Sequence, residues 1–500
     1  MEKLHPIMFA GTGSDVGKSI IAAAFCRIFR QDGYHPAPFK AQNMALNSYA
    51  TPEGLEIGRA QAVQAEAAGV PCHTDMNPLL LKPSSDHTSQ VVLNGRPIGN
   101  RSAYEYFRVE GREELRHEVC SAFDRLATRY NPIVMEGAGS ISEINLRDTD
   151  LVNLPMALHA GADVILVGDI DRGGVFASVY GSLMLLRPYE RERIKGILIN
   201  KFRGDIRLFE SGVKMLEELC GIPVVGVVPY YKDIYIEEED SLALATKSVQ
   251  TEQGKVNIAV VLLRHLSNFT DFNVLERDPR VHLFYTNNVD ELAKADIILL
   301  PGSKSTLADL HELRRNGVAQ AVIRAHREGA TVMGICGGYQ IMGQEVCDPD
   351  HVEGEIERLP GLGLLPVSTH MTGEKITRQV RFHLTMDNGQ LTINATDSAA
   401  HSQLSTLNSQ LLQGYEIHMG TTVPVYDAPV SPLNLLEDGG ADGYFLDRTC
   451  IGTYIHGILD NPSFIDFLLE PFADKIAESF EITSQDSFAH IHCMGFHFCQ

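Results

Sequence analysis

Residues 11–19 read GTGSDVGKS, after an apolar run, PIMFA, and before a helix-like stretch, IIAAAFCRIFRQ, at 20–31. In this stretch Ile20, Ala24 and Ile28 recur at four-residue spacing, which gives one apolar face to pack on a sheet. A helix that begins at a glycine-rich loop points its backbone N–H groups into that loop, where they suit a phosphate. The stretch therefore predicts a parallel α/β domain that holds a nucleotide.

The loop also supplies side chains for a magnesium nucleotide. Gly13 and Gly17 allow close approach of the backbone, Lys18 can reach the outer phosphates, and the Ser19 hydroxyl can bind Mg²⁺. The first glycine, Gly11, lies one residue earlier than in the common G-x-x-x-x-G-K-[ST] pattern. This variant is similar to the loop of the dethiobiotin-synthetase-like ATPases. A glycine turn with a purely structural purpose is the alternative.

Two further charged residues end predicted strands of the same sheet. Lys40 ends PAPFK, where its ammonium could meet a γ-phosphate or a substrate carboxylate, and Glu136 ends NPIVME, where it could be a second contact for Mg²⁺. A solvated lysine and a helix-capping acid are the alternatives. Another strand end supplies site-lining candidates: Asp169, Asp171 and Arg172.

The order of patterns predicts two doubly wound α/β domains. Apolar runs of strand length alternate with crossover-length segments in both halves of the chain, which is typical of parallel sheets covered by helices. We expect a P-loop-type domain with flanking helices at 1–236, a polar linker at 237–254 and a second domain at 255–500. Residues 370–410, rich in Thr, Asn, Ser and Gln, are expected to be irregular or antiparallel.

A second candidate site centres on Cys336 in GICGGYQIMG, a cysteine in a glycine-rich turn between a predicted strand and a helix. A nucleophile at such a turn projects outward, close to backbone N–H groups. His456 in GTYIHG, at another strand end, could activate the thiol. The N–H groups of Gly337 and of Gly302, in LLPGSKST, could hold an oxyanion. A small buried cysteine without chemistry is the alternative.

This constellation resembles a class I glutamine amidotransferase, in which the cysteine attacks the glutamine amide, ammonia leaves and water releases glutamate. In much of that family a glutamate two residues after the histidine orients the imidazole, but here Ile458 occupies the position. The resemblance then implies a Cys–His pair, for which Glu416 or His418 could supply help or could be purely structural. The second domain is accordingly expected to have the amidotransferase fold.

Composition and charge limit the partners and the cellular compartment that we expect for this chain. The formal net charge of −22 opposes nucleic acid and anionic membrane surfaces, and the apolar runs are shorter than the ~20 residues of a membrane helix. The start reads as a first strand and not as a signal peptide, so we expect a cytoplasmic protein. The nine cysteines form no CxxC pair, which argues against disulfides. The terminal AHIHCMGFHFCQ matches no familiar zinc spacing.

Longer blocks resemble the glutamine-hydrolysing cobyric acid synthases of cobalamin biosynthesis over about residues 5–470, in the order PFKAQNMALNS, NPLLLKP, GAGSISEINL, INKFRGD, LSNFTDF, LPGSKST, GICGGYQIMG, GYEIHMG and GTYIHG. The resemblance implies that ATP activates carboxylates of a corrinoid as acyl phosphates and that ammonia from glutamine then forms amides at the b, d, e and g positions of adenosylcobyrinic acid a,c-diamide. It implies Mg²⁺ with the ATP. Basic candidates for contacts with this anionic substrate are Lys40, Lys82, Arg172 and Arg203.

Two other functions remain open from the residues. A cobyrinic acid a,c-diamide synthase would have the same domain plan, although the AQNMALNS block favours the first family. A non-catalytic P-loop switch protein of the partitioning type would share the phosphate loop but would have no use for the thiol turn and its distant histidine.

Overall fold

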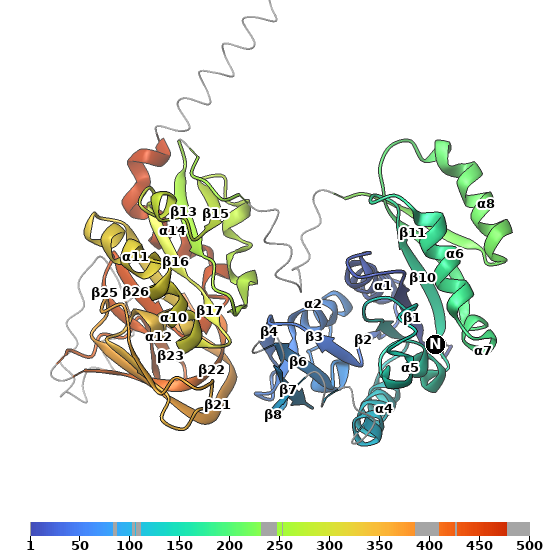
Figure 1. Cartoon of the computed structure of the whole chain (residues 1–500), viewed down its shortest axis with the longest axis horizontal. Coiled ribbons are helices and arrows are strands. Elements are labelled where there is room, and N and C mark those ends of the chain that lie inside the picture. The colour runs from blue at the N-terminus through green and yellow to red at the C-terminus, as the bar shows by residue number, and fades with distance from the viewer. Residues whose placement is uncertain are drawn as a thin grey trace, which may run out of the picture. The chain divides into compact units, whose positions relative to one another are not determined.

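The computed structural model describes residues 2–83, 88–102, 106, 112–231, 248–252, 254–385, 410–425 and 428–477. The chain divides into two compact units, Met1–Glu239 and Asp240–Gln500 (Figure 1). Most of the expected linker and all of the terminal segment rich in histidine and cysteine lie outside the described residues. Within the described residues, no helix combines the length and the apolar character needed to span a bilayer.

The first unit is built on a six-stranded sheet in the order β12-β11-β10-β1-β9-β2, with every pair parallel. In chain order the strands are β1 (Ile7–Gly11), β2 (Ala37–Phe39), β9 (Ile133–Glu136), β10 (Asp163–Asp169), β11 (Ile194–Phe202) and β12 (Val224–Pro229). Because side chains alternate along a strand, both faces of the central strands need apolar residues. The parallel sheet predicted from the apolar runs is confirmed.

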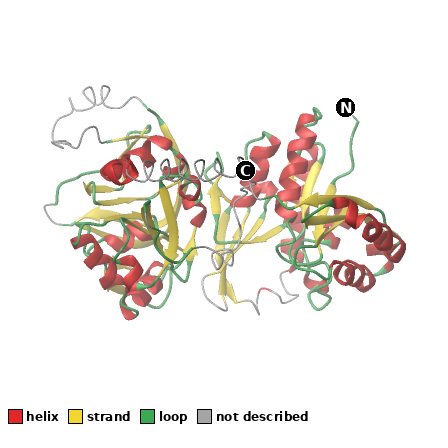
Figure 2. Cartoon of the chain, turned by 90° about the horizontal axis from the view of Figure 1, so that it is seen from above, coloured by secondary structure: helices red, strands yellow, loops and turns green. Residues whose placement is uncertain are grey.

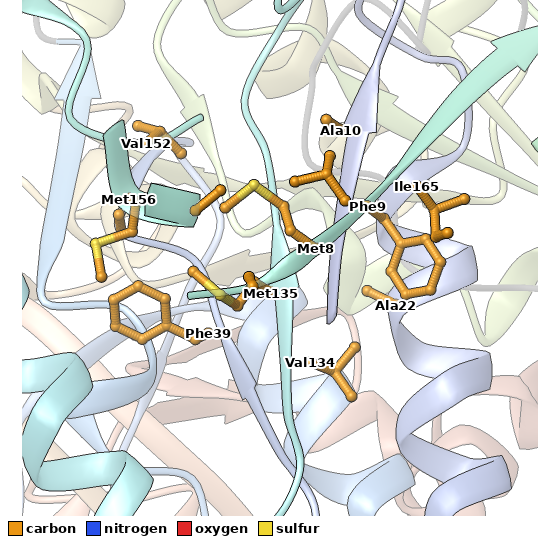
Figure 3. Close-up of a cluster of buried hydrophobic side chains, with 14 of the residues drawn as sticks. Met8, Phe9, Ala10, Ala22, Phe39, Val134, Met135, Val152, Met156 and Ile165 are labelled. Atoms are coloured by element: carbon orange, nitrogen blue, oxygen red, sulfur yellow. The ribbon is translucent and has the colours of Figure 1, made fainter. Parts of the chain in front are cut away.

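The centre of this sheet shows the two-sided packing directly. On β1, Phe9 points to the side of Ala22, whereas Met8 points to the side of Met156 (Figure 3). The Phe9 ring also packs at a tilt on the ring of Phe25, with 4.7 Å between the ring centroids; Ala22 and Phe25 both belong to the first helix. The helices of the unit are α1 (Lys18–Gln31), α2 (Arg59–Ala68), α4 (Arg112–Arg129), α5 (Leu154–Ala160), α6 (Val175–Leu185), α7 (Pro188–Arg191) and α8 (Glu210–Cys220). Because all strands of this sheet are parallel, their carboxyl ends share one edge, where the candidate site residues lie.

A smaller mixed sheet, which the sequence did not reveal, is inserted after β2. Its order is β3-β6-β7-β8, with β3 (Gln42–Met44) parallel to β6 (Leu79–Pro83) and antiparallel pairing through β7 (Thr88–Leu93) to β8 (Arg96–Ser102). A short pair, β4 (Ser48–Ala50) and β5 (Glu56–Gly58), leads into α2. The AQNMALNS block thus forms the start of this insertion beside Lys40.

The second unit also contains a six-stranded sheet, in the order β15-β13-β16-β18-β26-β25, parallel except for β25. Figure 2 colours the strands of the chain yellow and its helices red. The strands are β13 (Val256–Val261), β15 (Val281–Thr286), β16 (Ile297–Leu300), β18 (Thr331–Ile335), β25 (Tyr444–Asp447) and β26 (Cys450–Thr453). The helices are α9 (Val289–Leu292), α10 (Thr306–Arg315), α11 (Val318–Arg327), α12 (Gly337–Met342) and α14 (Pro462–Leu469). This confirms the second α/β domain.

A largely antiparallel sheet stands beside it in the same unit. The long strands β21 (Val367–Leu384) and β22 (Leu412–Pro424) pair with each other, and β22 also pairs with β27 (Ile455–His456). Its other strands are β19 (Glu345–Cys347), β20 (Arg358–Pro360), β23 (Asn434–Leu436) and β24 (Ala441–Asp442). Of the segment 370–410, residues up to Leu384 take the antiparallel form, and 386–409 lie outside the described residues.

Two candidate active sites

The phosphate loop joins β1 to α1 in the predicted manner. Gly17, the residue before α1, has φ of 95°, a left-handed conformation that glycine adopts without steric penalty. A Cβ at this position would also lie 2.2 Å from Nδ2 of Asn200, which donates a hydrogen bond to the carbonyl of Val16 at 2.8 Å. The end of β11 therefore supports the loop from behind.

The Lys18 ammonium lies over the loop that precedes it. Its Nζ donates to the carbonyl oxygens of Gly13 at 2.8 Å and of Gly139 at 3.0 Å. A Cβ on Gly11 would meet this Nζ at 2.8 Å, so the early glycine of the variant loop makes room for the lysine. Phosphate oxygens, which carry full charge, are stronger acceptors for an ammonium than these neutral carbonyls.

The predicted residues Ser19, Lys40 and Glu136 meet at one buried carboxylate. Glu136 accepts hydrogen bonds at Oε1 from Ser19 Oγ at 2.8 Å and from Lys40 Nζ at 2.9 Å, and at Oε2 from Gln64 Nε2 at 2.6 Å. Burial alone would raise the pKa of Glu136, but the charge of Lys40 and the hydrogen bonds from Gln64, Lys40 and Ser19 outweigh it and lower the pKa. The carboxylate is therefore held in its charged form.

This cluster fits a magnesium ion. Mg²⁺ prefers hard oxygen ligands, typically one or two carboxylates together with hydroxyl, water and phosphate oxygens. Ser19 and Glu136 supply a hydroxyl and a charged carboxylate within hydrogen-bonding distance of each other, next to the phosphate loop. Gln64 was missed by sequence reasoning, although two glutamines among alanines on the buried face of α2 were a usable signal.

The site-lining candidates of the β10 end lie at the rim of the loop. Asp169 accepts at Oδ2 from Lys201 Nζ at 2.9 Å, and the same ammonium donates to the carbonyl of Asp15 in the phosphate loop at 2.5 Å. Arg172 is exposed, 3.8 Å from the Asp15 carboxylate. Asp171 forms an ion pair with Arg203, whose guanidinium lies 3.5 Å from the centroid of the Tyr230 ring.

Lys82 does not take the position expected of a contact for an anionic substrate. It is buried, and its Nζ donates to Glu56 Oε1 at 2.7 Å and to Ser48 Oγ at 2.9 Å. A buried ammonium needs a paired charge of its own, and this one has it on β5, next to the small sheet. These contacts favour a structural role for Lys82, and a substrate contact there stays a prediction.

In the second unit, Cys336 stands at a strained turn between β18 and α12. Its φ of 54° and ψ of −111° are rare for a residue with a Cβ, and such strain is typical of nucleophiles on strand-to-helix turns. The Cys336 N–H donates to the carbonyl of Thr453 at 2.8 Å, which ties the turn to β26. A Cβ on Gly338 would lie 1.9 Å from the Leu300 carbonyl oxygen, so this glycine allows the helix to start against β16.

His456 faces the cysteine and is held from behind by Asp271. The imidazole is 1% exposed, its Nδ1 lies 2.7 Å from Asp271 Oδ2, and the Gly457 N–H donates to Asp271 Oδ1 at 3.1 Å. Burial would lower the pKa of His456, but the charges of Asp271 and Cys336 and its hydrogen bonds to both raise the pKa to about 10. This arrangement could serve as a nucleophile, a base and an orienting acid.

Asp271, which lies on the short turn Phe269–Phe272, is the acid that sequence reasoning missed. Neither alternative replaces it. Glu416 forms an ion pair with Arg378, and His418 bonds the Gly420 carbonyl at 3.2 Å while it stacks on Tyr454 at 3.7 Å. Burial lowers the pKa of His418 to about 4, so this ring is neutral. The structural interpretation of both residues therefore fits the contacts.

The backbone near Cys336 favours Ser303, and not the expected Gly302, as one of the two oxyanion donors. Lys304 N–H bonds the His265 carbonyl where β17 (Gly302–Ser303) pairs with β14 (Leu266–Ser267) in antiparallel fashion. Hydrogen-bonded and non-bonded positions alternate in such a pair, so the Gly302 N–H faces β14 and the Ser303 N–H faces away. A Cβ on Gly337 would lie 2.7 Å from the Ser303 nitrogen. These contacts favour the amides of Gly337 and Ser303 over that of Gly302.

A phosphate loop with a magnesium-type cluster in one unit, and a thiol, imidazole and carboxylate in the other, define a glutamine-dependent amidotransferase of the ligase class. Residues 7–243 match the CobQ/CobB/MinD/ParA nucleotide binding domain, and residues 257–464 match the CobB/CobQ-like glutamine amidotransferase domain. The cobyric acid synthase of Bacteroides fragilis is 82% identical over 96% of this chain and 92% of its own length.

Two further relatives carry the same name. The cobyric acid synthase of Phocaeicola vulgatus is 75% identical over 95% of this chain and 92% of its own length, and that of Parabacteroides distasonis is 59% identical over 94% and 91%. The chain belongs to the cobyric acid synthase family, which confirms the resemblance found in its motifs.

Proposed function

We propose that the chain amidates the b, d, e and g carboxylates of adenosylcobyrinic acid a,c-diamide with ATP and glutamine. The observation that carries the proposal is the pairing of a strained Cys336 with a His456 that Asp271 orients, in a chain that also holds charged Glu136 beside a phosphate loop. The names of the relatives support this substrate over that of an a,c-diamide synthase. A P-loop switch protein would have no role for the thiol site.

In the glutaminase step, Cys336 attacks the side-chain amide carbon of glutamine. His456 gives its proton to the leaving nitrogen, so that ammonia departs and a thioester remains. The amides of Gly337 and Ser303 face the oxyanion that forms in each tetrahedral intermediate. Water, deprotonated by the now neutral His456, then cleaves the thioester and returns the thiol, with glutamate as the product.

In the synthetase step, a corrinoid carboxylate attacks the γ-phosphorus of ATP and ADP leaves, which gives an acyl phosphate. Lys18 neutralises charge on the transferred group, and Lys40 serves either that group or the carboxylate. Bound at Ser19 and Glu136, Mg²⁺ would neutralise phosphate charge. Ammonia attacks the acyl carbon, loses a proton, and expels phosphate to leave the amide.

The test incubates the protein with glutamine, ATP, Mg²⁺ and either cobyrinic acid or its a,c-diamide, and follows the mass of the corrinoid. We expect stepwise replacement of OH by NH₂ on the a,c-diamide, with ATP consumed at each step. Amidation of cobyrinic acid alone would favour the a,c-diamide synthase. Absence of glutamate release and of amidation with both corrinoids would refute the proposal. Because ATP and glutamine are available in the cytoplasm, we infer that the reaction takes place there, with small molecules as its partners.

A further inference from the structure

Two buried glutamines lie on the same face of α2. Gln61 and Gln64 are three residues apart, which puts their side chains side by side along the helix, and their exposed fractions are 0% and 1%. Among the described residues, each has one amide atom without a hydrogen-bond partner, Nε2 in Gln61 and Oε1 in Gln64. Buried polar atoms are nearly always paired, so each of these atoms needs an explanation.

The partners of the two amides differ. Gln64 Nε2 donates to Glu136 Oε2 at 2.6 Å and to the backbone carbonyl of Ser19 at 3.3 Å, so the amide is anchored in the Ser19 and Glu136 cluster. Gln61 Oε1 instead accepts from Asn43 Nδ2 at 3.2 Å, away from that carboxylate. The two hydrogen bonds donated by Gln64 Nε2 turn the amide nitrogen toward Glu136 and Ser19, and the amide oxygen therefore points elsewhere.

We propose that Gln64 is a residue of the magnesium site: its Nε2 holds Glu136, and its unpaired Oε1 accepts the metal or a water on the metal. The ligand preference of Mg²⁺ supports this proposal, because an amide oxygen, a hydroxyl and a carboxylate together are a set of hard oxygen donors. The proposal rests on the nucleotide-dependent function above and adds a third protein side chain to Ser19 and Glu136. Groups that orient metal ligands typically change metal affinity by about 10- to 100-fold when removed.

The experiment compares the wild type with Gln64→Ala, Gln64→Glu and, as the matched control, Gln61→Ala. Each full-length protein is titrated with Mg²⁺ at saturating non-hydrolysable ATP analogue, and the melting temperature is followed. Gln64→Ala should need at least about 10-fold more Mg²⁺ for its half-maximal rise, while Gln61→Ala should keep the wild-type midpoint because Gln61 does not contact Glu136.

The Gln64→Glu variant distinguishes a role in metal binding from a general loss of stability. It puts a second carboxylate where the amide now meets Glu136, so the metal-free protein should melt lower through repulsion of like charges. Mg²⁺ should relieve the repulsion and raise its melting temperature by more than it raises that of the wild type. If the wild type and both Gln64 variants had the same Mg²⁺ midpoint and the same rise in melting temperature, the role of Gln64 in the metal site would be overturned, but the nucleotide site would not. A wild type without any response to Mg²⁺ and nucleotide would overturn the nucleotide site as well.

Discussion

Nδ1 of His456 lies 2.7 Å from Oδ2 of Asp271, a residue 185 positions earlier in the chain. The contact replaces the glutamate that many class I amidotransferases carry two residues after the histidine, where this chain has Ile458. It also explains why the imidazole favours its charged form despite complete burial. The charged imidazole faces Cys336, so it is placed to give its proton to a group that leaves when the sulfur attacks a substrate.

Asp271→Asn should remove the charge that holds the imidazolium. The pKa of His456, about 10 in the wild type, should fall, so that the imidazolium loses its proton at a lower pH as the pH rises. We expect glutamine hydrolysis to drop by roughly 10²- to 10⁴-fold, by analogy with acid-to-amide changes in other triads, while synthesis with ammonium persists. Glutaminase rates measured across pH check this.

Glu416→Gln is the control for the Asp271 substitution. It removes a carboxylate that pairs with Arg378 and leaves the contact between His456 and Asp271 in place. Its glutaminase rate and pH profile should stay near those of the wild type. If Glu416→Gln shifted the profile and Asp271→Asn did not, Glu416 would be the orienting acid.

Cys336→Ala should abolish glutamine-dependent synthesis, by at least ~10³-fold, and leave synthesis from ammonium. Cys336→Gly should do the same to activity but should be more stable than Cys336→Ala, by about 1 kcal/mol, because only glycine accepts φ of 54° with ψ of −111° without strain. Denaturant unfolding of the two variants measures the difference. Greater stability of the alanine variant would argue against stored strain at this turn.

Lys18→Ala should stop synthesis from both nitrogen sources, because activation of the carboxylate precedes attack by ammonia. Glutamine hydrolysis at Cys336 should remain measurable. Product formation is followed with glutamine and, separately, with ammonium. Normal turnover with ammonium in a folded Lys18→Ala protein would show that the lysine has no part in phosphoryl transfer.

Lys82→Met should destabilise the first unit without a specific effect on the reaction. It removes the ammonium that pairs with the buried Glu56 carboxylate, and breaking a buried ion pair typically costs about 3–5 kcal/mol. The double variant Lys82→Met/Glu56→Leu should recover much of the loss, because it removes both charges of the buried pair. Denaturant midpoints of the three proteins provide the comparison. A single variant as stable as the wild type, with impaired binding of the corrinoid, would instead restore Lys82 as a substrate contact.

The sequence predicted the parts of the two sites that local motifs encode. Lys18 and Ser19 follow from the order of strand, glycine loop and helix, and Cys336 follows from a glycine-rich turn of the same kind. Lys40 and Glu136 could be placed beside the loop because the carboxyl ends of parallel strands share one edge. Such predictions need only local pattern and the general geometry of doubly wound folds.

The site residues that the sequence did not predict depend on contacts between distant segments of the chain. Asp271 reaches His456 through a short turn that no spacing rule links to it, and Gln64 reaches Glu136 from a helix that follows an inserted sheet. The choice of Ser303 over Gly302 depends on the register of two very short strands. Lys82 looked like a substrate contact because its buried partner, Glu56, lies on another strand of the insertion.

The most direct test of the account uses glutamine carrying heavy nitrogen only at its amide, together with ATP, Mg²⁺ and adenosylcobyrinic acid a,c-diamide. The account predicts heavy nitrogen in the new amides of the wild-type product, no product from glutamine with Cys336→Ala, and unlabelled product when that variant receives ordinary ammonium. Product that lacks the heavy nitrogen in the wild type, or labelled product from Cys336→Ala, would contradict it.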